Sequence, residues 1–174
     1  MIRIAITGPE SCGKTSLSED LAAHYKAGYV PEFARNYLLE RNGKYVYEDL
    51  DQIAIGQVQA IQQQLEQEQE KNLLIVDTEM LVMYIWSMVV FGKVSPLIQK
   101  LLAEQKFDLY ILCDTDIPWQ YDPLRENEYD RDDLFQRYYK KMRELKLNFI
   151  IVKGPAEARL NEAVKAIDAL GFGH

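Results

Sequence analysis

The sequence predicts an α/β protein in which a parallel sheet is covered by helices on both faces. Short apolar runs that are typical of buried strands alternate along the chain with longer segments of helical periodicity. The first run, residues 2–6, ends at Thr7-Gly8-Pro9, which is a strong turn signal. No repeat and no change in composition divides residues 1–174, so we expect a single domain.

Five apolar runs are predicted to form the strands of the sheet. Leu73-Leu74-Ile75-Val76 ends at Asp77 and has the pattern of a central parallel strand. Gly28-Tyr29-Val30 is closed by Pro31 and predicts a short strand. The predicted strands cover residues 2–6, 28–30, 73–76, 108–113 and 149–152.

Helices are predicted where apolar side chains recur at steps of three to five residues. The clearest helix covers residues 49–71, and its other face is rich in Gln and Glu. That face indicates a solvated surface or, on the alternative interpretation, an interaction surface. Gly154-Pro155 opens the last helix and Gly171 ends it. The other predicted helices cover residues 14–26, 33–41, 80–91, 95–105 and 132–146.

Composition excludes several classes of function. The 174 residues carry 20 Lys and Arg against 27 Asp and Glu, so the net charge is −7 and the overall basic footprint of a protein that binds duplex DNA or anionic membranes is missing. Two Cys and two His exclude a disulfide framework, a Cys-rich zinc site and a His-rich metal centre. The most apolar stretch, 80–91, is too short to span a bilayer, and no secretory signal precedes the first strand. We therefore expect a cytoplasmic protein that binds small molecules and neither nucleic acid nor membrane, with its oligomeric state left open.

The most specific motif is a phosphate-binding loop. Residues 8–15, Gly-Pro-Glu-Ser-Cys-Gly-Lys-Thr, fit G-x-x-x-x-G-K-[ST] and stand between a predicted strand and a predicted helix. In such a loop the backbone N–H groups point at phosphate oxygens, Lys14 reaches the β- and γ-phosphates, and the Thr15 hydroxyl is placed to bind Mg²⁺. Cys12 is expected to act through its backbone N–H and not as a redox-active thiol. The residues predicted to bind ATP are Gly8, Glu10, Ser11, Cys12, Gly13, Lys14, Thr15 and Ser16.

Two acidic residues at strand ends are the candidates for metal binding and proton transfer. Asp77 follows the central strand, where a carboxylate is needed to hold nucleotide-bound Mg²⁺; Glu79 is a weaker candidate for that role. Glu32 follows the second strand, and in a parallel sheet it shares one crevice with the phosphate loop. It is therefore predicted to orient an acceptor hydroxyl and take its proton, although a helix-stabilising acid at that position is the alternative. Whether Glu32 or Asp77 is the base stays open.

Residues 114–132 predict a loop that covers the site. The segment leaves the fourth strand and is rich in Pro, Asp and aromatic residues, which is too long and too polar for a simple connection. Arg125 and Arg131 are candidates for closing over the phosphates and offsetting the charge that develops during transfer. The alternative is that both arginines form solvated ion pairs with Asp122, Asp130 and Asp132.

Four stretches together resemble a known family. They are residues 8–17, Pro-Glu-Phe-Ala-Arg at 31–35, Asp77-Thr78, and Asp-x-Pro-Trp-x-x-Asp-x-x-Arg at 116–125. This set is similar to the ribosylnicotinamide kinase domain of NadR-type proteins, over residues 2 to about 167. The resemblance implies a P-loop kinase fold with sheet order 2-3-1-4-5. It also implies ATP-dependent phosphorylation of the 5′-hydroxyl of nicotinamide riboside. NadR-type proteins usually carry an adenylyltransferase domain ahead of the kinase, so we expect here a free-standing kinase.

The resemblance also implies residues that bind the acceptor: Glu32, Arg35, Trp119 and Asp122. Nicotinamide riboside carries a cationic pyridinium ring, which an aromatic face attracts. Trp86, Trp119 and Tyr121 are the candidate faces, whereas we expect Tyr84 to lie in the core.

Two further functions stay open at this stage. The same scaffold permits a kinase of another nucleoside, nucleotide or small alcohol. A regulatory module that binds ATP without transferring phosphate, and docks a partner through its Gln-rich helix, is the other alternative. A GTPase is disfavoured because no Asn-Lys-x-Asp tetrad occurs in the chain.

Overall fold

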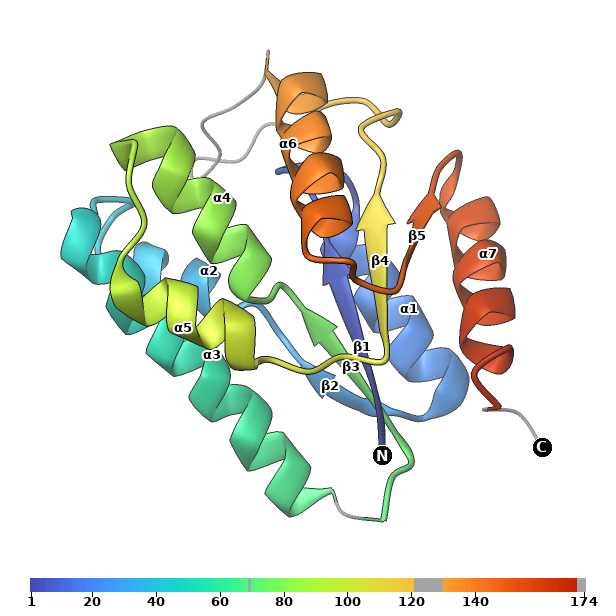
Figure 1. The fold of residues 1–174 in the computed structure, drawn as a ribbon. Helices are drawn as coiled ribbons and strands as arrows, with labels where there is room; N and C mark the ends of the chain where they lie inside the picture. The colour runs from blue at the N-terminus through green and yellow to red at the C-terminus, as the bar shows by residue number, and fades with distance from the viewer. Residues whose placement is uncertain (69, 121–129, 172–174) are drawn as a thin grey trace.

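The computed structural model describes residues 1–68, 70–120 and 130–171, which form a helix–sheet–helix sandwich (Figure 1). Five parallel strands make one sheet in the order β2-β3-β1-β4-β5. The α/β class and the order implied by the resemblance are both confirmed. The strands are β1 (Ile2–Thr7), β2 (Gly28–Val30), β3 (Leu73–Asp77), β4 (Leu109–Cys113) and β5 (Phe149–Val152).

The described part of the chain has seven helices, of which six lie between strands and α7 follows β5. They are α1 (Lys14–Tyr25), α2 (Phe33–Glu40), α3 (Tyr47–Gln67), α4 (Met80–Phe91), α5 (Pro96–Glu104), α6 (Arg131–Glu144) and α7 (Ala156–Asp168). The predicted boundaries hold to within one or two residues, except at the end of α3. That helix stops four residues before Lys71, because Lys71 turns back to Glu68, to which it donates from both its N–H and its ammonium group.

The sheet is buried on both faces, which explains why its strands are continuous apolar runs. Ile4 and Ile6 of β1 pack with α1 and α7, whereas Ala5 between them packs with α4 and α6. In the same way, Leu74 and Val76 of β3 face α3. In Figure 1, α1 and α7 accordingly lie on one side of the sheet and α3, α4 and α6 on the other.

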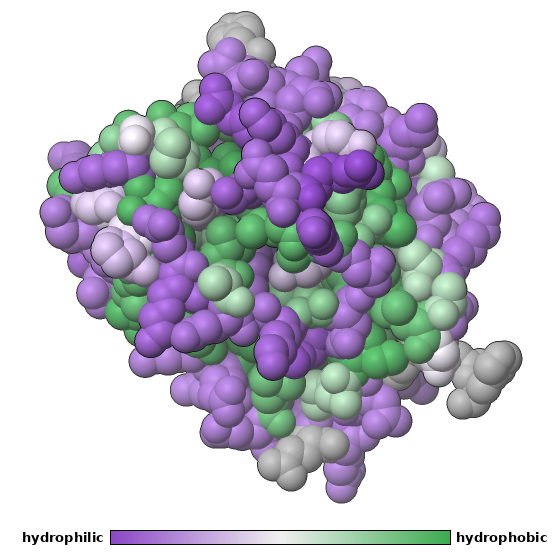
Figure 2. Space-filling model, in the orientation of Figure 1, coloured by the Kyte–Doolittle hydropathy of each residue, from purple (hydrophilic) through white to green (hydrophobic). Residues whose placement is uncertain are grey.

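The outer surface divides into polar and apolar regions. Figure 2 shows polar side chains over α6 and an apolar group over the end of α4 at the upper left. There Met88, Val89 and Val90 are each about two-fifths exposed. Among the described helices, none is long and apolar enough to cross a membrane.

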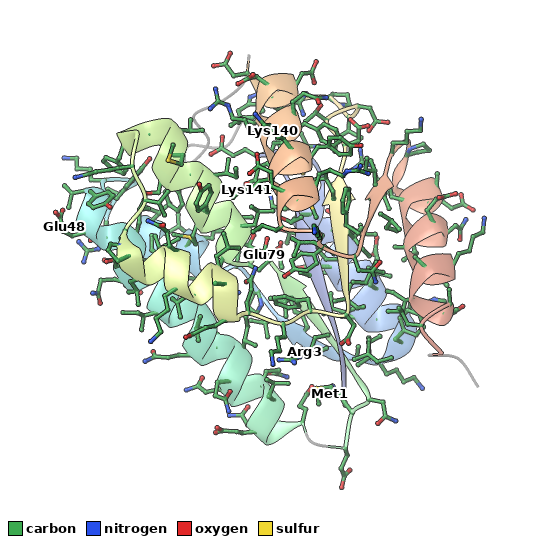
Figure 3. All side chains as sticks on the ribbon, viewed as in Figure 1. Met1, Arg3, Glu48, Glu79, Lys140 and Lys141 are labelled. Carbon is green, nitrogen blue, oxygen red and sulfur yellow. The ribbon has the colours of Figure 1, made fainter. Side chains whose placement is uncertain are left out.

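A buried carboxyl fixes the turn between β3 and α4. Glu79 lies at the start of α4 against the sheet (Figure 3), where one oxygen accepts from the Thr7 hydroxyl at 2.9 Å and the other from the Leu81 N–H at 2.6 Å. The Gln105 amide also donates to Glu79, at 2.6 Å. Burial raises the pKa of Glu79, and these hydrogen bonds oppose that effect. Glu79 is therefore a helix cap whose two oxygens both accept hydrogen bonds, and the weaker suggestion that it binds metal stays a prediction.

Because the strands are parallel, the polar residues at their carboxyl ends lie along one edge of the sheet. The register pairs Ile6 of β1 with Asp77 of β3, and Thr7 with Leu112 of β4. The loop after β1 is therefore flanked by Asp77 on one side and the end of β4 on the other. Glu32, just beyond β2, completes this edge.

We expect Gly56→Ala to destabilise the fold although alanine favours helices. A Cβ at Gly56 of α3 would stand 2.3 Å from the Phe33 ring of α2, so that ring must move. Overpacking of this kind costs about 1–3 kcal/mol, which exceeds the roughly 1 kcal/mol gained in helix propensity. Urea unfolding measures the difference. Addition of Phe33→Leu should recover part of the loss, and a Gly56→Ala variant more stable than the parent would contradict the packing.

Candidate active site

The loop between β1 and α1 is pressed against the end of β4. A Cβ at Gly8 would lie 2.9 Å from the Cys113 carbonyl oxygen, so no larger residue fits there. Gly8 and Gly13 have φ of 136° and 81°, values that side-chain-bearing residues rarely adopt. The loop therefore makes a tight turn over residues 9–12 and leads directly into α1, as the motif predicts.

Lys14 folds back over this loop. Its ammonium donates to the carbonyls of Gly8 at 3.0 Å and Pro9 at 2.7 Å. Burial favours the neutral amine, but the negative groups around it, Glu32 and Asp77 among them, outweigh burial and raise the pKa of Lys14. A fixed positive charge thus stands at the loop.

Thr15 and Asp77 form the candidate metal site. The Thr15 hydroxyl donates to Asp77 Oδ2 at 2.7 Å, whereas Asp77 Oδ1 is buried and has no hydrogen-bond partner within the described chain. Burial raises the pKa of Asp77, and the charge of Lys14 opposes the rise. An orphaned carboxylate oxygen beside a hydroxyl fits a hard cation such as Mg²⁺, which is usually held by one or two protein oxygens together with phosphates and water. The described residues contain no cluster of three or more His, Cys, Asp or Glu that could hold a metal ion.

Glu32 stands at the cavity, opposite the phosphate loop. It is the N-cap residue of α2, yet its side chain makes no capping hydrogen bond to the described backbone. Burial raises the pKa of Glu32 above its ordinary value, and the nearby Lys14 charge only partly offsets this.

A buried glutamine that sequence reasoning missed fixes the segment that carries Glu32. Gln57 of α3 is 2% exposed, and its carbonyl accepts from the Phe33 N–H at 2.8 Å. Its amide approaches the Pro31 carbonyl at 3.5 Å. The sequence signal that could have identified Gln57 was its position, as a polar residue, close to the apolar face of the predicted helix 49–71.

The phosphate loop and Glu32 line a cavity of about 300 Å³, and Asp77 and Gln57 lie outside its described lining. One end is polar and is formed by the loop residues predicted to bind ATP, together with Glu32 and Arg35. The other end is apolar and aromatic. The residues that line this second end are Leu38, Tyr45, Val82, Ile85, Trp86, Val89, Val90, Leu134 and Tyr138.

Trp86 is the tryptophan that reaches the cavity. Its indole N–H donates to the Tyr45 hydroxyl at 3.0 Å, and the two rings meet edge to face with centroids 5.0 Å apart. Tyr84 packs between core clusters beneath Lys141, as expected. Tyr45 and Tyr138 were not anticipated as lining residues, because only the tertiary fold brings their helices and loops to this point.

The predicted lid residues separate into two groups. Asp122 and Arg125 lie outside the described residues. Arg131 donates to the carbonyls of Ser11 at 3.1 Å and Ile117 at 3.0 Å, and its guanidinium lies 5.8 Å from the centre of the Trp119 ring. Arg131 thus contacts the backbone of the phosphate loop, while Trp119 lies against Arg131 and outside the cavity lining.

The Cys12 thiol is part of the loop's internal structure. It is fully buried and donates to the Pro9 carbonyl at 2.9 Å. Burial would raise the pKa of this thiol, but a hydrogen bond from Cys113 and the charge of Lys14 lower it to about 7. The interpretation of Cys12 as a residue that acts through its backbone agrees with this burial.

The sequence of the chain is similar to those of known proteins of NAD biosynthesis. Over 156 residues the chain is 29% identical to the trifunctional NAD biosynthesis/regulator protein NadR of Salmonella typhimurium, and 28% identical to that of Escherichia coli. Each alignment covers 86% of this chain but 38% of the relative, so the chain spans about two-fifths of the length of these relatives.

Solved structures share the fold. The crystal structure of a NadR protein in complex with NR superposes with a TM-score of 0.81 at 20% identity, covering 97% of this chain and 51% of that one. A thymidylate kinase from Ehrlichia chaffeensis gives 0.66 at 17% identity, with 95% and 98% covered. The fold is therefore that of P-loop nucleoside and nucleotide kinases. A family model described as an AAA domain matches residues 3–159, and the chain belongs to that family of P-loop proteins.

Proposed function

We propose that the chain is an ATP-dependent kinase that phosphorylates the 5′-hydroxyl of nicotinamide riboside (NR), giving nicotinamide mononucleotide. The observation that carries the proposal is the cavity in which Lys14 and Glu32 face one space between a phosphate loop and an aromatic end. A solved NadR structure in complex with NR, and another with NAD and AMP-PNP, support the choice of acceptor and donor.

The polar end of the cavity suits the triphosphate of ATP. Backbone N–H groups at a helix N-terminus attract phosphate, and the Lys14 ammonium can leave the carbonyls of Gly8 and Pro9 for phosphate oxygens. Thr15 and Asp77 would hold Mg²⁺, which when bound neutralises charge on the β- and γ-phosphates. Arg131, through Ser11, keeps the loop in place, and Arg125 is proposed to reach the phosphates from the predicted lid.

Glu32 is proposed as the base. In the transfer the acceptor oxygen forms a bond to the γ-phosphorus, the bond from that phosphorus to the β–γ bridging oxygen breaks, and ADP leaves. The hydroxyl proton passes to the Glu32 carboxylate. A carboxyl whose pKa is raised by burial holds that proton better than an exposed one.

The aromatic end suits a cationic ring. The indole of Trp86, held by its hydrogen bond to Tyr45, lines the cavity, and cation–π attraction to such a ring contributes roughly 0.5–2 kcal/mol. Arg35 lies at the cavity and is proposed to bind the ribose side of the acceptor, while Trp119 and Asp122 belong to the predicted lid. A regulatory module needs neither a base nor an acceptor cavity, and this favours the kinase.

Substrate profiling tests the proposal. Purified protein is incubated with Mg-ATP and a panel of nicotinamide riboside, adenosine, deoxyadenosine, cytidine and thymidylate, with ADP release as the readout. Nicotinamide riboside should be the preferred acceptor. A faster neutral nucleoside or nucleotide would refute the acceptor assignment, and release of ADP with none of them would refute the kinase.

Lys14→Met should abolish transfer without unfolding the protein. The variant keeps the stem of the side chain and loses the charge that stabilises the transferring phosphate, so turnover should fall about 100-fold or more. Lys100→Met on α5, an exposed lysine paired with Glu104, is the matched control and should leave turnover unchanged. A folded Lys14→Met protein with normal turnover would overturn the role of the loop.

Glu32→Gln should slow turnover by about 10²–10⁴-fold and change its pH dependence. The base acts when deprotonated, and its pKa is raised, so turnover of the parent should be present at high pH and fall as the pH drops through a value above 4.5. The variant should lose this acid limb, whereas Glu40→Gln, on the exposed end of α2, should retain it. If Glu32→Gln keeps the limb and Asp77→Asn removes it, Asp77 is the base.

Trp86→Ala should mainly raise the KM for nicotinamide riboside, by about 2- to 30-fold, the equivalent of a cation–π contact. The KM for a neutral nucleoside should change less, and Trp86→Phe should be intermediate. Steady-state kinetics with both acceptors measures this difference. An unchanged KM in Trp86→Ala together with a raised one in Trp119→Ala would place the ring at the lid instead.

A further inference from the structure

A buried arginine on α7 contacts the phosphate loop from outside the cavity. Arg159 is 3% exposed and does not appear among the described residues that line the cavity. Its Nη1 donates to the Cys12 carbonyl at 2.6 Å, and its Nε donates to the Gly154 carbonyl at 2.8 Å. Nη2 donates to the Asp114 carbonyl at 3.0 Å and also to the Asp116 carboxylate.

One guanidinium therefore ties together the loops that follow three strands. Cys12 lies after β1, Asp114 and Asp116 after β4, and Gly154 after β5. Asp116 reinforces the assembly, because its second oxygen accepts from the Gly154 N–H at 2.6 Å. The planar fork of arginine can serve all these acceptors at once, which a lysine ammonium cannot do.

The contact with Cys12 sets the orientation of one peptide unit. The peptides of the described chain are trans, and in a trans peptide the carbonyl and the following N–H point in opposite directions. Because Arg159 holds the Cys12 carbonyl outside the cavity, the Gly13 N–H is turned the other way, away from Arg159. Arg131 acts in the same manner one residue earlier, through the Ser11 carbonyl.

The hydrogen bonds of Arg159 hold loop carbonyls in place, and this bears on anion binding as well as on the fold. Burying a guanidinium is costly, and replacing a buried ion pair with apolar side chains is often neutral or stabilising. An arginine that donates to loop carbonyls also fixes the neighbouring backbone N–H donors before an anion binds. This preorganisation lowers the free-energy cost of binding the anion.

We propose that Arg159 is a positioning residue that fixes the Cys12–Gly13 peptide so that the Gly13 N–H is presented to a bound phosphate before nucleotide arrives. The inference rests on the phosphate-binding part of the proposed function and is independent of which acceptor is used.

The test compares Arg159→Met and Arg159→Lys with the parent protein, using calorimetric titration with Mg-AMP-PNP at a temperature well below each melting point. Loss of a charge-assisted hydrogen bond predicts about 10- to 100-fold weaker binding in Arg159→Met. Arg159→Lys should be intermediate, and the KM for the acceptor should stay unchanged in both. Arg137→Met, on the exposed face of α6 and paired with Asp133, is the matched control and should bind as the parent does.

A spectroscopic readout separates positioning from general support of the fold. In ¹⁵N spectra the Gly13 amide signal of nucleotide-free Arg159→Met should move away from its parent position, because the peptide is released. AMP-PNP affinity within twofold of the parent, together with an unmoved Gly13 signal, would overturn the proposal.

A measurement on the parent protein covers the case in which the variants do not fold. On addition of Mg-AMP-PNP the Gly13 amide signal should shift strongly, while the Cys12 carbonyl ¹³C signal stays in place, because its bond to Arg159 is already formed. A large shift of that carbon would show that the peptide reorients on binding, and the proposal would fail. If nucleotide binds as expected but no acceptor is phosphorylated, the proposed function fails and this inference stands.

Discussion

The close approach of the loop after β1 to the end of β4 is the constraint on which the rest of the site depends. Gly8 leaves no room for a side chain against the Cys113 carbonyl, and the loop that begins there leads directly into α1. The central place of β1 between β3 and β4 then brings Asp77 to one flank of the loop. This turn therefore sets where the loop residues line the cavity and where Thr15 meets Asp77.

Charge balance follows from the same geometry. Glu32 and Asp77 are both drawn out of water, which raises their pKa values, and Lys14 is the cation that each of them shares. Burial lowers the pKa of Lys14, but Cys12 and these two acids raise it more, so Lys14 stays charged. The site holds two buried carboxyls and one ammonium, so a further cation would be stabilised there. The Asp77 oxygen without a hydrogen-bond partner agrees with this, as does a nucleotide that binds together with a metal ion.

Much of the fold and of the candidate site was predictable, because the sequence patterns that indicate them are local. The phosphate loop depends on eight consecutive residues, and the edge that gathers Glu32 and Asp77 depends only on parallel strands whose apolar runs are visible in the sequence. Arg159, Gln57 and the Trp86–Tyr45 pair were not predictable, since each acts on a partner between 24 and 147 residues away. Arg131 was predicted to contact the phosphates themselves, yet it donates to the backbone carbonyls of Ser11 and Ile117, because α6 begins beside the loop.

The most direct test of the proposed phosphate transfer is a crystal structure of the protein with Mg-AMP-PNP and nicotinamide riboside bound together. The account predicts that the Lys14 ammonium leaves the carbonyls of Gly8 and Pro9 for the γ-phosphate. It also predicts that the 5′-hydroxyl lies within hydrogen-bond reach of Glu32, with the pyridinium ring against Trp86 and Tyr45. A riboside bound elsewhere, or a 5′-hydroxyl turned away from Glu32 while the γ-phosphate occupies the loop, would contradict it.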